Sequence, residues 1–262
     1  MKKFIVIIII LIVASLAWSY KNRGPKVLEA DLPLAQDYQE FVNTNTIPEE
    51  VATNTVEVVE EPYIESVEEP VVVQTSINLD VPFTSQAPTA DWVQPFQDAC
   101  EEASLLMVDY YYQNQDLPDV EQVEVVLLDM IGWQQEMWEG HFNLTLDDLD
   151  DFVKTNTEYR TEIVEDLTIE KIKSYLNRGL PLIVPADGTK LANPFFKNGG
   201  PDYHMLVIKG YTEDKIITND PGTSRGADFI YTYENMLYSI ADWNKKESLA
   251  TGPKRALILY RD

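Results

Sequence analysis

The sequence predicts a single α+β domain, in which helices come first along the chain and a largely antiparallel sheet follows. Apolar residues recur at helical spacing over residues 100–156, whereas short apolar runs of strand length dominate residues 159–260. The chain has 262 residues, of which 45% are hydrophobic and 11% aromatic, and this is enough for one sizeable core. We therefore expect one globular domain, over residues 79–262.

Residues 1–23 have the composition of a segment that enters a membrane. Two lysines precede an apolar run at residues 4–20, and Lys21 and Arg23 follow it. This run is long for the core of a signal peptide and short for a full span, so a cleaved signal peptide and a retained membrane anchor both stay open. In either case we expect the domain to be extracytoplasmic, membrane-anchored or secreted.

The next segment, residues 24–78, is acidic. Between Val27 and Asn78 there are twelve Asp and Glu, four Pro and no Lys, Arg or Gly. A segment of this kind repels itself and can bury little apolar surface, so it predicts a disordered linker that holds the domain away from the membrane. The valine run at residues 71–73 could instead pair as an edge strand.

The domain begins with an apolar alternation from residue 79 and then turns helical. Asp98 is followed three residues later by Glu101, which predicts a capping box and places Cys100 in the first turn of a helix. Further helices are expected over residues 120–138, from a cap at Thr145, and over residues 169–177.

Strand signals dominate the second half, with a short helix near residues 234–243. They fall at residues 159–164, 182–185, 203–211, 215–219, 229–233 and 255–260. The turn-forming residues 212–214 join two of these strands as a hairpin. If Tyr211 pairs with Lys215, the position opposite His204 is near Thr223, and Asp220 lies within three residues of that point.

Composition excludes several functions. The net charge of −24 should repel nucleic acid, so no nucleic-acid partner is expected. A single cysteine excludes a disulfide framework and a four-cysteine zinc site. The acidic run at residues 147–151 lacks the oxygen spacing and the central glycine of a calcium loop. We expect no metal and no cofactor.

Cys100 is the candidate nucleophile. The positive end of a helix dipole favours a thiolate, but the carboxylates of Asp98, Glu101 and Glu102 oppose it, so a cationic partner is needed. Of the two histidines, His141 lies in a loop-like stretch and His204 in an apolar strand, which can hold an imidazole steady.

Asp220 follows the next strand and could fix the tautomer of His204. The alternatives are structural. A lone strand histidine is often an ordinary core residue, and an Asp before Pro is often an ordinary turn residue.

Four motifs, in this order along the chain, resemble those of a known family. They are VPFTSQ at residues 81–86, CEEAS at residues 100–104, HMLVIKGY at residues 204–211 and NDPGT at residues 219–223. Through them, residues 79–262 resemble the bacterial papain-like cysteine peptidases related to the double-glycine leader peptidases of bacteriocin exporters. The phosphate-binding loop of the exporters, G-x-x-x-x-G-K-[ST], does not occur in the sequence, so a place in an ATP-driven transporter chain is not expected.

The resemblance implies a papain-like fold and a Cys-His-Asp triad. In this triad Cys100 attacks a carbonyl carbon, His204 relays the proton and Asp220 orients the imidazole. The backbone N–H of Cys100 and a glutamine side chain would hold the oxyanion. We favour Gln86, which carries the family motif, over Gln94, which has the six-residue offset of papain relatives, and over Gln97.

The sequence therefore predicts an extracytoplasmic cysteine peptidase that cleaves a peptide or protein substrate through an acyl-enzyme. Two alternatives remain. The same triad could serve an amidase or acyltransferase acting on cell-wall peptides, or the domain could be a catalytically silent surface module that binds peptide.

Overall fold

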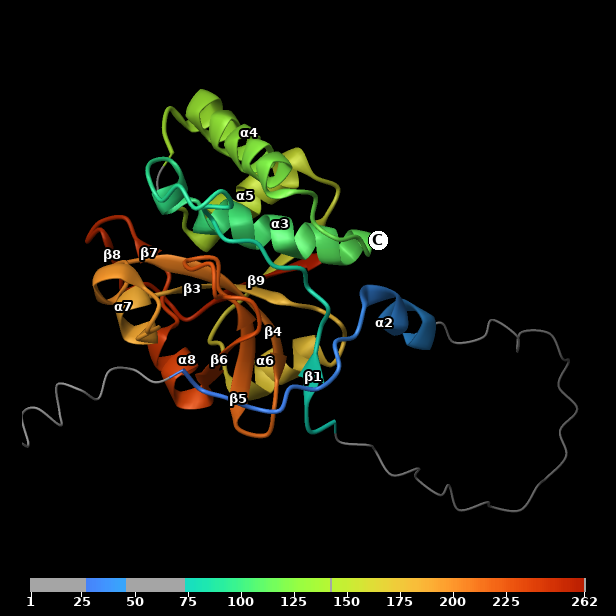
Figure 1. Cartoon of the computed structure of the whole chain (residues 1–262). Helices are drawn as coiled ribbons and strands as arrows, with labels where there is room; N and C mark the ends of the chain where they lie inside the picture. Colours follow the sequence, from blue (N-terminus) through green and yellow to red (C-terminus); the bar gives the residue numbers. More distant parts are fainter. Residues whose placement is uncertain (1–26, 46–73, 142, 262) are drawn as a thin grey trace, which may run out of the picture.

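The computed structural model describes residues 27–45, 74–141 and 143–261, and its centre is a seven-stranded antiparallel sheet (Figure 1). The strand order is β2-β9-β3-β4-β5-β6, and β1 pairs with β4 beside this path. A two-stranded sheet, β7-β8, lies apart from it. The strands are β1 (Ile77–Asn78), β2 (Arg160–Val164), β3 (Leu182–Ala186), β4 (His204–Tyr211), β5 (Lys215–Asn219), β6 (Phe229–Thr232), β7 (Trp243–Asn244), β8 (Leu249–Ala250) and β9 (Ala256–Tyr260).

The longer helices come before most of the strands, as predicted. Figure 1 shows α3, α4 and α5 gathered on one side of the sheet, where α3 packs against β4 and α4 packs against α3. The helices are α2 (Tyr38–Asn45), α3 (Cys100–Gln113), α4 (Val120–Trp138), α5 (Leu146–Asn156), α6 (Ile169–Leu176), α7 (Gly188–Leu191) and α8 (Tyr233–Ser239). The predicted α+β fold, with the helix of Cys100 packed on a mostly antiparallel sheet, is confirmed.

The N-termini of α5 and α3 differ in whether the predicted side-chain cap forms. Thr145 caps α5 through a capping box, in which its hydroxyl accepts from the backbone N–H of Asp148 and the Asp148 carboxylate accepts from the N–H of Thr145. The capping box predicted at Asp98 and Glu101 is wrong. The N-cap of α3 is Ala99, which makes no side-chain cap bond, and Glu101 is turned into the interior, where it is completely buried.

Strand β4 lies in the middle of the sheet, and all eight of its residues are buried. On one side it pairs with β3, with Ala186 opposite His204. On the other side it pairs with β5, with Val207 opposite Asn219. A histidine at the start of such a strand has little freedom to move, which is what a fixed imidazole requires.

The hairpin of β4 and β5 is confirmed, with a difference in register. Tyr211 pairs with Ile216 and not with the predicted Lys215. An irregularity between Ile208 and Gly210 then shifts the pairing back by one residue, so that nearer His204 the register is the predicted one. The first residue of β4 therefore lies beside the residues that follow β5.

Part of the segment expected to be a disordered linker is ordered. Gln36 forms a parallel bridge with Leu79, and β1 pairs with the last residues of β4. On α2, the ring of Tyr38 packs edge-on against Tyr112 with the ring centroids 4.9 Å apart, and Phe41 lies against Gly179. The expectation is corrected here because apolar and aromatic side chains within the acidic segment find places on the domain.

The other expectations for the N-terminal region fall outside the described residues. These are the membrane-entering segment at residues 1–23 and the valine run at residues 71–73. Within the part of the chain that the structure describes, no helix combines the length and the apolar character needed to cross a membrane.

Candidate active site

His204 and Asp220 are in direct contact. The imidazole Nε2 lies 2.8 Å from Oδ1 of Asp220, and both side chains are buried, with exposed fractions of 1% and 0%. The pair arises because His204 opens β4 and Asp220 follows the last residue of the antiparallel strand β5. With Nε2 held by the carboxylate, Nδ1 is the ring nitrogen left to exchange a proton with another group.

The carboxyl group of Asp220 is held from several sides. Its Oδ1 also accepts from the backbone N–H of Gly222 at 3.0 Å. Its Oδ2 accepts from the Tyr231 hydroxyl at 2.6 Å and from the Asn193 amide at 3.0 Å. Although burial opposes ionisation, the charge of His204 and these hydrogen bonds keep the pKa of Asp220 below its ordinary value.

Asn193 and Tyr231 were not predicted as site residues. Each is an isolated polar residue in its own stretch of sequence, so no spacing pattern connects either of them with Asp220. The loop over residues 193–202 borders the site through Asn193 and through Phe196. The Phe196 ring lies edge-on to the imidazole of His204, with the ring centroids 5.3 Å apart.

At Gly222 the backbone comes close to the side chains of the site. A Cβ atom at this position would lie 2.9 Å from Cε1 of His204 and 2.8 Å from Cε1 of Phe196. Contacts this short do not occur between ordinary side chains, so any larger residue would push the imidazole or the phenyl ring aside.

Cys100 is the first residue of α3 and is buried. Its thiol donates to Oε2 of Glu101 at 3.0 Å, not to His204. Burial, and next the charge of Glu101, raise the pKa of the Cys100 thiol well above its ordinary value, whereas a backbone hydrogen bond from Met205 works in the opposite direction. Because Met205 follows His204 on β4, this bond places the sulfur at the same end of that strand as the imidazole.

The three candidate glutamines all donate hydrogen bonds within the segment that leads to Cys100. The Gln86 amide donates to the carbonyls of Phe96 at 2.9 Å and Gln97 at 2.8 Å, so both of its hydrogens are in use. The Gln94 amide donates to the Asp98 carboxylate at 2.7 Å. Gln97 donates to the carbonyl of Trp92 at 2.7 Å.

The first and the fourth sequence motifs also touch each other in space. The backbone N–H of Gln86 donates to the carbonyl of Pro221 at 3.0 Å, and the amide of Asn219 donates to the carbonyls of Val81 and Pro82. The first motif therefore lies against the fourth, which carries Asp220. Gln86 is thus joined through the backbone to the Asp220 loop and through its side chain to the segment before Cys100.

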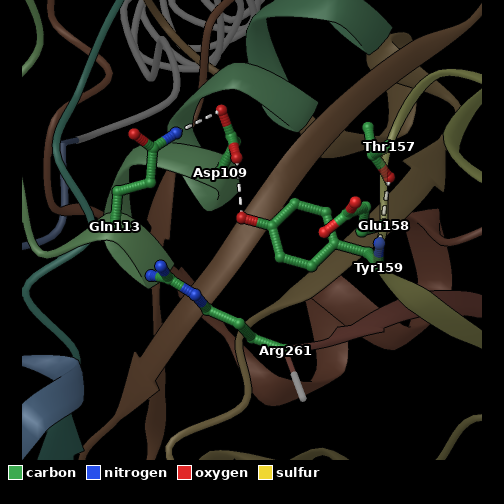
Figure 2. Close-up of a pocket in the computed structure, with 6 residues that line it drawn as sticks. All are labelled: Asp109, Gln113, Thr157, Glu158, Tyr159 and Arg261. Carbon is green, nitrogen blue, oxygen red and sulfur yellow. Dashed lines mark hydrogen bonds between the residues drawn. The ribbon is translucent and has the colours of Figure 1, made fainter.

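A cavity of about 580 Å³ lies elsewhere, beside the other end of α3 (Figure 2). Asp109 accepts there from the Tyr159 hydroxyl at 2.6 Å and from the Gln113 amide at 2.8 Å. Asp109 lies two and a half turns after Cys100, about 14 Å along the helix axis. None of the predicted site residues lines this cavity. The lining residues are Asp109, Gln113, Thr157, Glu158, Tyr159 and Arg261.

Comparison with known sequences places this arrangement in a family. Residues 78–251 match the sequence profile of the Peptidase_C39 like family, which is well over half of the chain. The chain belongs to the Peptidase_C39 like family. As a member it is a cysteine peptidase, and the resemblance drawn from the four motifs is confirmed.

Two solved structures are similar to this Peptidase_C39 like chain at low identity. A C39-like peptidase from Bacillus anthracis has 17% identity and a TM-score of 0.48, over 72% of this chain and 99% of the other. The peptidase domain of Streptococcus ComA, a bifunctional ABC transporter involved in a quorum-sensing pathway, has 13% identity and a TM-score of 0.34, over 63% of this chain and 93% of the other. No protein with a curated description matches the chain.

The described part of this Peptidase_C39 like chain holds no group of three or more His, Cys, Asp or Glu side chains placed to bind a metal ion.

Proposed function

We propose that this chain hydrolyses peptide bonds through an acyl-enzyme, with Cys100 as nucleophile, His204 as acid and base, and Asp220 as the group that orients the imidazole. The buried contact of 2.8 Å between His204 and Asp220 carries the proposal. It lies at the start of β4, which packs against the helix that begins at the only cysteine of the sequence. Membership of the Peptidase_C39 like family supports the reaction class.

The proton path follows from the ring nitrogens. Because Nε2 of His204 is bonded to Asp220, Nδ1 takes the proton from the Cys100 thiol. The thiolate attacks the substrate carbonyl carbon, and the imidazolium then gives its proton to the leaving amine. In the second half of the reaction His204 removes a proton from water, which hydrolyses the acyl-enzyme. Asp220 stabilises the imidazolium in both halves.

The negative oxygen formed in each half needs hydrogen-bond donors. We propose the backbone N–H of Cys100, in the uncapped first turn of α3, and the side chain of Gln86. Gln86 must release one of its bonds, to Phe96 or Gln97, in order to donate to the oxyanion. Loss of one such donor usually lowers the rate by about 100- to 1000-fold.

One observation favours a second candidate, a module that binds peptide without cleaving it. The Cys100 thiol is bonded to a carboxylate, and its pKa lies well above the ordinary value, mainly because it is buried. A thiol held permanently in this state would be a poor nucleophile.

Turnover separates the two candidates. The full chain is incubated with a mixture of synthetic peptides, and the products are identified by mass spectrometry, beside Cys100→Ser and His204→Ala variants. The proposal expects cleavage by the wild type and a loss of at least about 1000-fold in both variants. Peptide that is bound equally by the wild type and Cys100→Ser, and cleaved by neither, would instead establish the binding module.

We also propose that the reaction takes place outside the cytoplasm. Two lysines followed by the apolar run at residues 4–20 support this location. Thiol labelling of intact cells that express the chain tests it, with a membrane-impermeant maleimide and Cys100 as the only thiol of the chain. Labelling that occurs only after the cells are lysed would contradict it.

A further inference from the structure

Glu101 connects the sulfur of Cys100 to the helix layer. It is completely buried, and its two oxygens have different partners. Oε2 accepts from the Cys100 thiol at 3.0 Å, and Oε1 accepts from the backbone N–H of Leu144 at 2.9 Å. A carboxyl group fixed at one oxygen by the backbone presents its other oxygen to the sulfur in a constant position.

The acidic side chain that acts on Glu101 is a second buried carboxyl group. Glu102 lies next to it on α3 with a 2% exposed fraction, and its Oε1 contacts the Gln134 amide and lies 3.3 Å from Nε2 of His141. The histidine thus faces Glu102 and not the residue beside the sulfur. Burial, and next the charge of Glu102, raise the pKa of Glu101 to about 8, so Glu101 keeps its proton over much of the neutral range.

The protonation state of Glu101 decides which group donates the hydrogen bond between Glu101 and the sulfur. An ionised Glu101 accepts from the thiol and disfavours the thiolate by like charge. A protonated Glu101 donates its O–H to the sulfur and stabilises the thiolate, while the proton of Cys100 passes to His204. We propose that Glu101 is a positioning residue with two states. When Glu101 is protonated, it donates to the sulfur and stabilises the Cys100 thiolate. When Glu101 is ionised, it accepts from the sulfur and keeps Cys100 as a thiol. This inference rests on the proposed function.

Other polar groups around Glu101 are less suited to this role. Tyr203 donates from its hydroxyl to the carbonyl of Leu144 at 2.6 Å, and burial raises its pKa so far that it stays neutral. Asp242 is bonded to Arg255. For His141, burial opposes protonation but the contact with Glu102 raises its pKa above the ordinary value. The titratable side chains that interact with Glu101 are Cys100, Glu102, His141 and Tyr203.

The test is the rate of Cys100 alkylation by iodoacetamide in the full chain between pH 5 and 10, read from the mass of the single adduct. In the wild type, Glu101 and Cys100 are coupled, so the first proton that the pair loses near neutral pH comes partly from each group. The second proton is lost at higher pH, and the alkylation rate should therefore rise in two steps. In Glu101→Gln the amide can still accept from Leu144 and donates permanently to the sulfur. We expect a single step, with a rate at pH 7 close to that of the wild type and a rate at pH 9, where the wild-type Glu101 is ionised, about tenfold above it, which corresponds to about one pKa unit.

Glu102→Gln is the matched control, because it removes the adjacent buried carboxyl group, which contacts Gln134 and His141 and not the sulfur. It should keep the two steps. An unchanged or slower profile in Glu101→Gln would overturn the inference, and so would a single step in Glu102→Gln alone. A folded Glu101→Asp variant keeps the acid, but its side chain is one methylene group shorter and does not reach the sulfur. It should lose the first step of the rate profile.

A His204→Ala arm separates this inference from the proposed function. If His204→Ala slows the reaction at pH 7 and Glu101→Gln leaves the rate at pH 9 unchanged, the triad stands and the role of Glu101 fails. If His204→Ala changes nothing, the triad itself fails, and the inference fails with it.

Discussion

Four donors of the described residues surround the carboxyl group of Asp220. They are Nε2 of His204, the N–H of Gly222, the amide of Asn193 and the hydroxyl of Tyr231. Each oxygen accepts two of them, so the carboxylate can neither rotate nor lose its charge without breaking several bonds. At the scale of single residues, this fixed carboxylate is what gives His204 one tautomer.

Asp220→Asn tests this at the same scale. The amide keeps the shape of the carboxyl group but cannot stabilise an imidazolium, and it favours the wrong tautomer of His204. We expect kcat for a peptide substrate to fall by about 10³- to 10⁴-fold with little change in KM. Tyr231→Phe is the control, since it removes one hydroxyl bond and should cost about tenfold. Equal losses in both variants would mean that Asp220 has only a structural role.

Gly222→Ala is a second test at the residue scale. The added methyl group would overlap the imidazole of His204 and the ring of Phe196, so one of the two must move. We expect a large loss of kcat together with a smaller loss of stability, measured by peptide turnover and thermal unfolding. Gly132→Ala on α4 is the control, because a Cβ there meets nothing within 4 Å. Full activity in Gly222→Ala would show that the imidazole is not held as tightly as this contact requires.

Some of these residues could be predicted from the sequence and others could not. Cys100, His204 and Asp220 belong to motifs whose order and spacing restrict them to neighbouring elements. Asn193 and Tyr231 reach Asp220 only through the folded sheet and a long loop, so their local sequence carries no signal.

Among the elements, the β4-β5 hairpin shows how a local prediction succeeded despite an error. The pairing predicted at the turn was one residue off, and the irregularity between Ile208 and Gly210 compensated for it. A bulge depends on the surrounding sheet, here on β1, whose Ile77 carbonyl would lie 2.4 Å from a Cβ at Gly210. Turn chemistry alone could not have shown this.

Helix α2 was missed because composition was averaged over the acidic segment. Its Tyr38 and Phe41 are spaced three residues apart, on one face of a helix. This short apolar pattern is hidden by the acidic residues around it. Burial of the two aromatic side chains stabilises the helix only when the surface of the domain is there to receive them.

Phe41→Ala tests whether α2 is part of the folded domain. Because Phe41 is half-buried, we expect a loss of about 2 kcal/mol in the free energy of unfolding, less than for a complete core Phe. The loss is measured by denaturant unfolding of the full chain. Gln39→Ala changes an exposed residue of the same helix and should have little effect. A loss no larger than that of Gln39→Ala would show that α2 is part of the linker and not of the folded domain.

At the scale of the whole molecule, buried acids link stability to pH. The pKa of Glu101 rises from 4.5 to about 8 on folding. Its contribution to stability is therefore complete below about pH 4.5 and is lost as the pH rises through about 8. His141, whose pKa is also raised, acts in the same direction, whereas the lowered pKa of Asp220 gives stability that is lost at strongly acidic pH. The maximum of stability should lie at mildly acidic pH.

Thermal unfolding between pH 5 and 9 at constant salt checks this expectation. The melting temperature should fall toward pH 9, and Glu101→Gln should flatten the fall, since one group contributes at most about 1.4 kcal/mol per pH unit. Glu158→Gln, an exposed acid, should leave the slope unchanged. An identical slope in the wild type and Glu101→Gln would show that Glu101 is ionised in the folded protein throughout this range.

The central claim is that Cys100 and His204 act as a pair, and the alkylation rate of the only thiol tests it most directly. The wild-type chain and His204→Ala are treated with iodoacetamide at pH 6.5, and the single adduct is followed by mass. We predict that the wild type reacts clearly faster, because the imidazolium of His204 stabilises the thiolate below the ordinary pKa of a thiol, about 8.5. Equally slow reaction of both proteins would contradict it and would make Cys100 a structural residue of a binding module.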